Sequence, residues 1–250
     1  MRYALISDIH ANLPAIDAVL NDSSRRGIDE VYHLGDLVGY GAEPNHVVER
    51  ISRMEILGVS GNYDSTVALG APHCGCRYED PRQEAQSHES YAWTRARVTN
   101  EARTFLGALP FRIDLRPNGG HAPGPKVVLV HGTPTLNTLY WTEDRDDAFC
   151  LKMAAHAGAR PGDVICFGHT HKPWTRVVDG IRFVNTGSVG RPKDGDWRAG
   201  YVLLDVDAGS SAVEIVRVEY DVEQAMQAIR ASTLPADFAE YLRTGGKPNG

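Results

Sequence analysis

Ala4-Leu5-Ile6-Ser7-Asp8-Ile9-His10, close to the N-terminus, is an apolar run of strand length that ends in an aspartate and a histidine. In open parallel sheets, functional side chains gather just beyond the carboxyl ends of the strands. Residues i and i+2 of an extended backbone point to the same side, so Asp8 and His10 can reach one point in space. A carboxylate oxygen beside an imidazole nitrogen is typical of a divalent transition-metal site. The motif is weak alone, and a helix-capping aspartate beside a surface histidine is the alternative.

The composition indicates one large α/β core in a chain without a strongly basic face. The 250 residues carry a formal net charge of -6, and no run of lysine or arginine stands out. This charge argues against a broad nucleic-acid-binding surface. Four cysteines in a chain of this composition do not indicate a disulfide framework. We find neither a signal segment nor an apolar run long enough to cross a membrane, and therefore expect a cytoplasmic protein.

Strand and helix patterns alternate at the start of the chain, which predicts a parallel sheet with helical crossovers. The rhythm breaks at about residue 66, and we interpret 66–110 as a helical cap inserted into a single domain that spans 1–250. Asp179-Gly180, between two short strands, predicts a tight hairpin turn. The expected helices cover 13–26, 44–54, 84–97, 100–109, 144–157, 222–231 and 236–242. The expected strands cover 3–7, 30–34, 56–60, 111–115, 126–130, 163–167, 176–178, 181–184, 201–205 and 212–219.

Five of the expected strand ends carry side chains of the kinds that ligate metals, and tight turns with glycine lie next to them. In a parallel sheet these strand ends converge on one edge. Seven ligands are too many for one ion, but they suit two ions about 3.5–4 Å apart that share one carboxylate. Imidazole, carboxylate and amide ligands together favour Mn, Fe, Zn, Ni or Co over Ca or Mg. The candidate ligands are Asp8, His10, Asp36, Asn62, His131, His169 and His171.

Taken together, these motifs resemble the calcineurin-like metallophosphoesterase superfamily. In chain order they are D-x-H at Asp8, G-D-x-x-G at Asp36, G-N-x-D at Asn62, H-G at His131 and G-H-x-H at His169. The flanking segments 7–12, 34–41 and 185–190 resemble the small bacterial members of its phosphodiesterase-like branch. The resemblance covers the chain from Met1 to about Asp205. Each motif alone is weak, whereas five motifs in this order at strand ends are specific.

The resemblance implies a four-layer α-β-β-α sandwich, in which helices flank two facing mixed sheets and two metal ions lie at the strand ends. It also implies that Asp36 bridges the ions and that a water between them, with a lowered pKa, attacks phosphorus in line with the leaving oxygen. Manganese is the expected metal, with Fe, Ni, Zn or Co as alternatives. By this resemblance the first ion is held by Asp8, His10, Asp36 and His171. The second ion is held by Asp36, Asn62, His131 and His169.

One position departs from the family pattern G-N-H-[D/E]. Tyr63 stands where the family has a histidine that is taken as the general acid, and Asp64 stands where the family orients that histidine. Tyrosine has an unperturbed pKa of about 10 and is a poorer acid at neutral pH. One hypothesis is that monoesters with poor leaving groups are slow substrates, while activated diesters or anhydrides are tolerated. The other is that His73 or His88 of the cap reaches the site. Under either hypothesis, Asp64 is expected to accept a bond from Tyr63 or from a backbone amide.

Two further clusters stay open at this point. Cys74-Gly75-Cys76, beside His73, offers ligands for a metal or redox site. It lacks the second ligand pair of a zinc site, so we favour a chance loop pair. Arg191 and Lys193 follow the last glycine-rich loop, and they are either contacts for a substrate phosphate or solvated loop charges.

The leading hypothesis is a dinuclear metal-dependent phosphoesterase, and most simply a phosphodiesterase that acts on a small molecule or nucleotide. A phosphomonoesterase or protein phosphatase is the alternative enzyme, and the missing histidine counts against it. The fold also serves as a protein-binding subunit of the retromer coat, so a non-catalytic scaffold is a second alternative, against which the complete ligand set argues. The acidic charge disfavours a nuclease. No membrane contact is expected, and the oligomeric state is left open.

Overall fold

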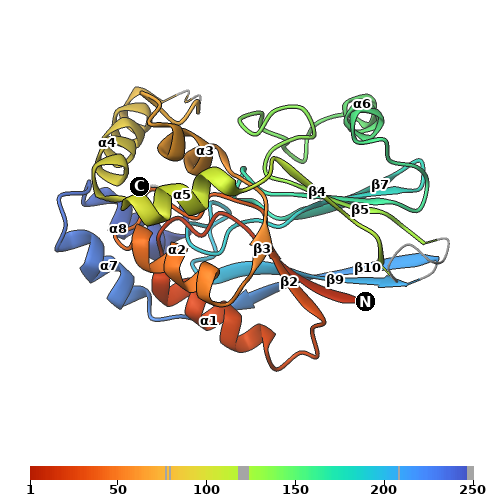
Figure 1. Cartoon of the computed structure of the whole chain (residues 1–250), viewed down its shortest axis with the longest axis horizontal. Helices are drawn as coiled ribbons and strands as arrows, with labels where there is room; N and C mark the ends of the chain where they lie inside the picture. The colour runs from red at the N-terminus through yellow and green to blue at the C-terminus, as the bar shows by residue number, and fades with distance from the viewer. Residues whose placement is uncertain (77, 79, 118–123, 208, 247–250) are drawn as a thin grey trace.

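Two mixed five-stranded sheets face each other in the computed structural model, which describes residues 1–76, 78, 80–117, 124–207 and 209–246 (Figure 1). One buried apolar cluster lies between the sheets, and two further clusters lie on their outer faces. Helices cover those outer faces. The α/β class and the four-layer α-β-β-α sandwich expected above are confirmed.

The first sheet contains the opening of the chain. Its strands are β1 (Arg2–Ile6), β2 (Glu30–His33), β3 (Leu57–Gly58), β9 (Ala199–Asp207) and β10 (Ser210–Val218), in the order β10-β9-β1-β2-β3. β1, β2 and β3 are parallel, whereas β9 runs antiparallel to both β1 and β10. Helices α1 (Leu13–Ser23) and α2 (Pro44–Arg53) are the crossovers. The Asn12 side chain accepts from the backbone N–H of Ala15 at 3.2 Å and caps α1.

The second sheet has the order β4-β5-β6-β8-β7. Its strands are β4 (Arg112–Leu115), β5 (Val127–Val130), β6 (Val164–Phe167), β7 (Trp174–Val178) and β8 (Ile181–Asn185). β5, β6 and β8 are parallel, and α6 (Asp147–Ala157) joins the first two. The predicted turn between β7 and β8 is confirmed, with φ of 47° at Asp179 and 75° at Gly180. Positive φ at both residues is what a two-residue turn of this hand requires.

The helices are divided unequally between the two outer faces. α3 (Asn62–Leu69), α4 (Pro81–Arg97), α5 (Asn100–Ala108), α7 (Val222–Arg230) and α8 (Asp237–Thr244) share a core with α1, α2 and the first sheet. Figure 1 shows α2, α4, α5, α7 and α8 together on one side of the molecule and α6 well apart from them. Within the described residues, no helix has the length and apolar character that crossing a membrane requires.

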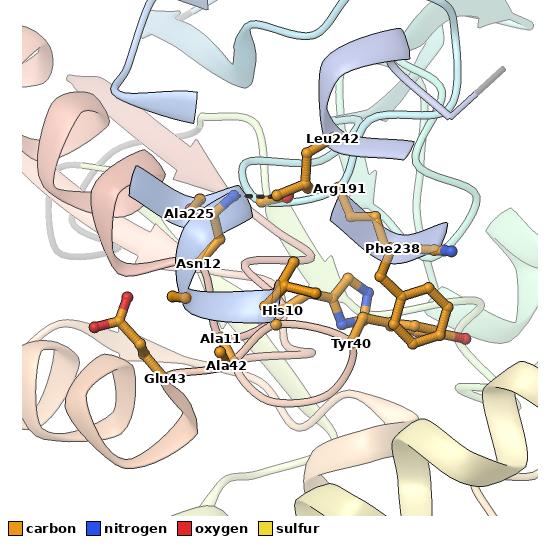
Figure 2. Close-up of a pocket in the computed structure, with 14 residues that line it drawn as sticks. His10, Ala11, Asn12, Tyr40, Ala42, Glu43, Arg191, Ala225, Phe238 and Leu242 are labelled. Atoms are coloured by element: carbon orange, nitrogen blue, oxygen red, sulfur yellow. Dashed lines mark hydrogen bonds between the residues drawn. The ribbon is translucent and has the colours of Figure 1, made fainter. Parts of the chain in front are cut away.

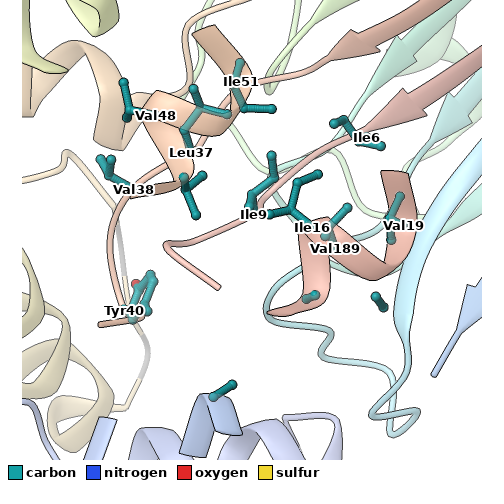
Figure 3. Close-up of a cluster of buried hydrophobic side chains, with 14 of the residues drawn as sticks. Ile6, Ile9, Ile16, Val19, Leu37, Val38, Tyr40, Val48, Ile51 and Val189 are labelled. Atoms are coloured by element: carbon teal, nitrogen blue, oxygen red, sulfur yellow. The ribbon is translucent and has the colours of Figure 1, made fainter. Parts of the chain in front are cut away.

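Both faces of the central strands are buried, and this separates the core into layers. In β1, Ala4 and Ile6 pack with the helices, whereas Leu5 packs between the sheets. In β5, Leu129 joins Leu5 between the sheets, whereas Val128 packs on the outer face with α6. Figure 3 shows Ile6 within the helix-side cluster. Alternate residues of a strand face opposite sides, so unbroken apolar runs supply two layers at once.

The largest departure from the expected elements follows β3. The strand has two residues instead of five, and residues Asn62–Leu69 form a helix where none was expected. The first half of this helix, Asn62-Tyr63-Asp64-Ser65-Thr66, lacks strong helix formers. The Asp64 carboxylate accepts from the backbone N–H of Gly61 at 3.0 Å and so caps the first turn. Tertiary contacts and this cap, rather than propensity, therefore account for α3.

The segment 66–110 shares its core with the first sheet. Val67 of α3, Tyr91 of α4 and Leu106 of α5 belong to the same buried cluster as Ile6. The segment therefore packs on the main core through the helices that it contains.

Candidate metal centre

All seven predicted ligands come together at one edge of the two sheets. Each of them is buried, with an exposed fraction of at most 4%. Because strands of both sheets end here, the site needs both sheets to be complete. Asp8 and His10 follow β1, Asp36 follows β2, Asn62 begins α3, His131 follows β5, and His169 and His171 follow β6.

Five of these residues hold the backbone in the left-handed region. The φ angle is 52° at Asp8, 48° at His10, 54° at Asp36, 65° at His169 and 60° at His171. Such a conformation costs on the order of 1–3 kcal/mol for a residue other than glycine, and it concentrates at functional sites. Nine described residues other than glycine have positive φ, so more than half of them are candidate ligands. The backbone strain therefore marks this edge of the molecule independently of the motifs.

The first group pairs two imidazoles with one carboxylate. His10 Nδ1 and His171 Nδ1 donate to the carbonyl oxygens of Val38 at 3.0 Å and Arg191 at 2.6 Å. A carbonyl only accepts, so each ring carries its proton on Nδ1 and presents a lone pair on Nε2. The two Nε2 atoms lie 3.1 Å apart, and Asp8 Oδ1 lies 3.2 Å from the Nε2 of His171. Within the described residues, Asp8 Oδ1 has no hydrogen-bond donor.

The second group gathers ligand atoms around His131. His131 Nδ1 donates to the carbonyl oxygen of Leu34 at 2.7 Å, which turns His131 Nε2 toward the other ligand atoms. This Nε2 lies 3.1 Å from Asn62 Oδ1, 3.2 Å from His169 Nδ1 and 3.4 Å from Asp36 Oδ2. The Asn62 amide is oriented by Cys74, because its Nδ2 donates to that residue's carbonyl oxygen at 3.1 Å.

Asp36 lies between the two groups. Its Oδ2 is 3.8 Å from His10 Nε2 and 3.4 Å from His131 Nε2, so one carboxylate oxygen faces both. Its Oδ1 accepts from the backbone N–H of Tyr63 at 2.9 Å, which restrains the rotation of the carboxylate. One carboxylate oxygen that faces two ligand groups has the geometry that sharing between two cations would require.

The electrostatics of the site favour bound cations. Burial and the neighbouring His171 hold the pKa of His10 well below its usual value, and burial and His131 do the same for His169. Burial also lowers the pKa of His171. Burial opposes protonation of His131 as well, but Asp36 outweighs this and raises the pKa to about 10.

Lone pairs that face each other in a buried site cost free energy unless a cation lies between them. The His10 and His171 Nε2 atoms and the unpartnered Asp8 oxygen form one such set. Neutral imidazoles and a carboxylate are also the protonation states that bind metals. The residues present therefore fit two divalent cations.

Asp64 supports the Asp36 loop. Its carboxylate accepts from the backbone N–H groups of Asp36 at 2.8 Å, Leu37 at 2.9 Å and Gly61 at 3.0 Å. Of the two partners expected for Asp64, the backbone amide is the one observed. Burial and the charge of Asp36 raise the pKa of Asp64 to about 7, while the N–H groups of Gly61 and Leu37 oppose that shift.

Gly61 is required because a Cβ atom there would overlap the carboxylate oxygen and the amide nitrogen of Asp36. We expect Gly61→Ala to displace Asp36 and to lower metal-supported hydrolysis about 100-fold, the cost typical of a 1 Å misplacement. Gly107→Ala is the matched control, because its new Cβ would meet only the Ala68 side chain, at 3.5 Å. Comparison of kcat/KM for the two variants checks this, and wild-type activity of Gly61→Ala would contradict it.

The Tyr63 hydroxyl lies in a buried polar cluster beside the two groups of candidate ligands. It is 3.2 Å from Ser87 Oγ, which the Tyr40 and Tyr78 hydroxyls also contact. The ring of Tyr63 meets the ring of His10 edge-on, with centroids 5.7 Å apart. Burial, together with the nearby tyrosines, raises the pKa of Tyr63 well above its usual value. This phenol therefore keeps its proton at neutral pH.

Neither cap histidine lies in the centre in this structure. His73 and His88 are both exposed. His73 Nδ1 accepts from the backbone N–H of Gly75 at 3.1 Å. Within the described residues, neither ring has a hydrogen bond or ion pair with a predicted ligand.

Sequence reasoning missed two contacts of the centre. Cys76 Sγ accepts from Asn62 Nδ2 at 3.1 Å, so the cysteine pair that we interpreted as a chance loop pair touches a candidate ligand. Tyr140 stacks on the His169 ring, with centroids 4.3 Å apart. Cys76 and Tyr140 lie in loops, whose positions cannot be predicted from a strand or helix pattern. No local sequence motif identifies either residue as a contact of the centre.

Arg191 and Lys193 are half-buried rather than fully solvated. The Arg191 guanidinium lies 4.0 Å from the ring centroid of Tyr40 and 5.4 Å from that of Phe238. The backbone N–H of Lys193 donates to the His171 carbonyl oxygen at 3.3 Å, and burial lowers the pKa of Lys193 to about 8. In the described part of the chain, neither side chain forms an ion pair. Two uncompensated cations therefore lie beside the first group.

A small cavity adjoins the same side of the centre. Figure 2 shows His10 on its wall, with Tyr40 and Phe238 on one side and Glu43 at the opposite end. Arg191 and residues of α7 and α8 complete the lining. Its volume of about 10 Å³ is the space of about one water molecule. The C-terminal helices thus pack closely against this side of the centre.

The sequence comparisons agree with this geometry. The family model of the calcineurin-like phosphoesterase superfamily domain matches residues 1–209 of the chain. The uncharacterized protein MJ0912 of Methanocaldococcus jannaschii is 34% identical over an alignment 265 positions long, which covers 97% of each chain. The phosphodiesterase YfcE of Escherichia coli is 26% identical over 217 residues, which cover 83% of this chain and 89% of YfcE.

Solved structures are similar over the whole chain. A metallophosphoesterase from Sphaerobacter thermophilus has a TM-score of 0.73 and 27% identity, with 98% of this chain and 99% of that one covered. The hypothetical protein PH1004 from Pyrococcus horikoshii OT3 has the same fold, with a TM-score of 0.80, 23% identity and 99% of each chain covered. The chain therefore belongs to the calcineurin-like phosphoesterase superfamily and is a metal-dependent phosphoric ester hydrolase.

Proposed function

We propose that this protein is a phosphodiesterase that hydrolyses a small-molecule or nucleotide phosphodiester at two divalent transition-metal ions. The observation that carries the proposal is the pair of buried ligand groups that both face Asp36 Oδ2. Asp8, His10 and His171 would hold one ion; Asn62, His131 and His169 would hold the other, and Asp36 would bridge them. A retained ligand set of this size has no use in a purely protein-binding scaffold.

The chain prepares the site before any substrate arrives. Backbone carbonyls fix the Nδ1 protons of His10, His131 and His171, and so aim their Nε2 atoms. Asp64 and the Tyr63 N–H hold the Asp36 loop and carboxylate. When bound, the two ions supply Lewis acidity and an activated water at neutral pH. Arg191 and Lys193 would contact phosphate oxygens, since they have no ion pairs among the described residues.

The preference for a diester rests on the absence of a strong general acid. The phenol of Tyr63 is buried beside Ser87 with a raised pKa, and the cap histidines are exposed. A leaving group must therefore depart with little protonation, which favours activated diesters over alkyl monoesters. The relative YfcE is named a phosphodiesterase, which supports the same choice.

Manganese is the proposed metal, because a mixed set of imidazoles, carboxylates and one amide suits a borderline transition ion. Residues 66–110 are proposed to act as a cap, since Cys76 and Ser87 within this segment contact Asn62 and Tyr63. Organisation as a single domain over 1–250 and location in the cytoplasm stay predictions from the sequence.

The test compares an activated diester, bis(p-nitrophenyl) phosphate, with its monoester, p-nitrophenyl phosphate. Full-length protein is stripped of metal and refilled with Mn, and kcat/KM is measured for both. We expect the diester to be the better substrate by a factor of about 10 or more, which corresponds to about 1.4 kcal/mol of transition-state stabilisation. Because both esters release p-nitrophenolate, which departs without protonation, this ratio reports the substrate class and not the missing acid. Faster monoester hydrolysis would favour the phosphomonoesterase alternative.

The matched controls separate the proposed reaction from other sources of activity. His131→Asn removes a ligand, whereas His46→Asn changes a histidine that is exposed on α2. Diester hydrolysis should be lost in the first variant and kept in the second. No turnover of either ester, together with no Mn binding, would leave the scaffold as the better account.

A further inference from the structure

Two thiols lie side by side above the second ligand group. The Cys74 S–H donates to Cys76 Sγ, and the two sulfur atoms are 2.7 Å apart. Gly75 between them has a φ of 77°, which turns the chain back on itself. The other two cysteines, Cys150 and Cys166, lie in the clusters of the second sheet. The chain therefore contains one described pair of thiols close enough to react with each other.

This pair orients a candidate metal ligand. Asn62 Nδ2 donates to the Cys74 carbonyl oxygen and to Cys76 Sγ, both at 3.1 Å. A carbonyl oxygen cannot donate, so the NH₂ group is fixed on the cysteine side and Oδ1 is fixed on the side of His131 Nε2. The Cys76 sulfur thus shares in deciding which way the Asn62 oxygen points.

The two cysteine residues differ in exposure to solvent. Cys74 is 2% exposed, whereas Cys76 is half-buried. A small oxidant can therefore reach Cys76 first. Cys74 lies in contact with it and can react with the oxidised Cys76 sulfur. Such a neighbour makes a disulfide the natural product of oxidation, ahead of a higher oxide of one sulfur.

We propose that Cys74 and Cys76 are a reversible oxidation site for a hydroperoxide, and that their disulfide weakens metal binding at the Asn62 side of the centre. The proposal rests on the proposed function, because it takes Asn62 as a metal ligand. The Cys76 sulfur attacks the peroxide O–O bond and becomes a sulfenic acid, with release of water from hydrogen peroxide. The Cys74 sulfur then displaces a second water and forms the S–S bond. Two thiols and one H₂O₂ thus give one disulfide and two H₂O, and the two electrons pass from sulfur to oxygen.

The effect on the centre follows from the shared contact. In the disulfide the Cys76 sulfur is bonded to Cys74, and the three-residue segment 74–76, which carries the Cys74 carbonyl, must adjust to this bond. Both acceptors of the Asn62 NH₂ group are therefore disturbed together. Loss of a partner that orients a ligand typically costs about 10–100-fold in metal affinity or activity. A thiol reductant restores the original contacts.

The experiment uses reduced, Mn-loaded full-length protein treated with hydrogen peroxide and then quenched. We expect the free thiols of the denatured chain to fall from four to two, with peptide mapping that places the new link between Cys74 and Cys76. Mn affinity should fall about tenfold or more, and diester hydrolysis should fall with it. Dithiothreitol should return all three readings to their starting values.

Two variants make the result specific, and each is compared with its own reduced form. Cys76→Ser removes the sulfur that attacks the peroxide, and its hydroxyl oxygen can still accept from Asn62 Nδ2, so peroxide should leave its Mn affinity unchanged. Cys150→Ala changes a buried cysteine in another cluster, so it should keep the full response.

Three outcomes would overturn the proposal. Four free thiols after peroxide would show that no disulfide forms, and a Cys76 sulfinic acid would show that Cys74 does not trap the intermediate. A mapped disulfide with unchanged Mn affinity would show that the link does not reach the centre. The three outcomes above would leave the proposed function intact. Reduced protein that binds no Mn at all would instead contradict the proposed function itself, so the two kinds of failure can be told apart.

Discussion

Asp36→Asn is expected to lower Mn-supported diester hydrolysis by about a thousandfold, because Asp36 Oδ2 faces both ligand groups at 3.4 and 3.8 Å. A shared carboxylate lost between two cations costs several kcal/mol of charge stabilisation, and about 1.4 kcal/mol corresponds to a factor of ten in rate. Asparagine keeps the size of the side chain and an oxygen that can accept from the Tyr63 N–H, so the loop should keep its shape. The measurement is kcat together with bound Mn per chain.

Asp147→Asn is the control for this variant. Asp147 lies at the start of α6 and pairs at the surface with Arg176, at 3.3 Å, so its change should alter neither rate nor metal content. A thousandfold loss confined to Asp36→Asn, with fewer than two Mn per chain, is the expected pattern. Full metal content and more than a tenth of wild-type activity in Asp36→Asn would refute the bridging role.

Metal binding is expected to raise the melting temperature of the protein by about 10–20 °C. A ligand at 100 times its dissociation constant stabilises the folded chain by about 2.7 kcal/mol per site. In a chain of this size, each kcal/mol moves the melting temperature by about 2–4 °C. The buried lone pairs and five strained ligand residues make the metal-free centre unfavourable, so binding energy should appear directly as stability.

The measurement for this second prediction is thermal unfolding with Mn and with a chelator. His171→Asn should lose roughly half of the Mn-dependent increase, because it removes a ligand from one group only. His46→Asn, an exposed histidine on α2, should retain all of it. An increase of the same size in His171→Asn and wild type would place the bound Mn elsewhere on the protein.

The seven candidate ligands were predictable from the sequence as one group, but part of the reasoning was wrong. We expected Asp8 and His10 to share a side because the strand remained extended. β1 ends at Ile6, and both residues lie in left-handed conformations beyond it. They still face one group, with Asp8 Oδ1 3.8 Å from His10 Nε2. The D-x-H motif therefore predicts correctly that Asp8 and His10 lie together, but the alternation of side chains along a strand does not explain why they do.

The surroundings of the ligands could not be predicted, because contacts across long separations decide them. The helix that begins at Asn62 depends on Asp64 and on packing, which local propensity does not report. The position of the Tyr63 hydroxyl depends on Ser87, which is 24 residues away in a different helix. The link between the cysteine pair and the site is the contact of Cys76 with Asn62, which only the structure reveals. Short spacings predicted the candidate ligands, and contacts formed by the fold orient them.

Anomalous diffraction from crystals grown with Mn tests the central claim most directly. The account predicts two Mn peaks about 3.5–4 Å apart on either side of Asp36 Oδ2, one near His10 and His171 and the other near Asn62 and His131. A single peak that leaves one of these groups without metal, or peaks away from Asp36, would contradict it.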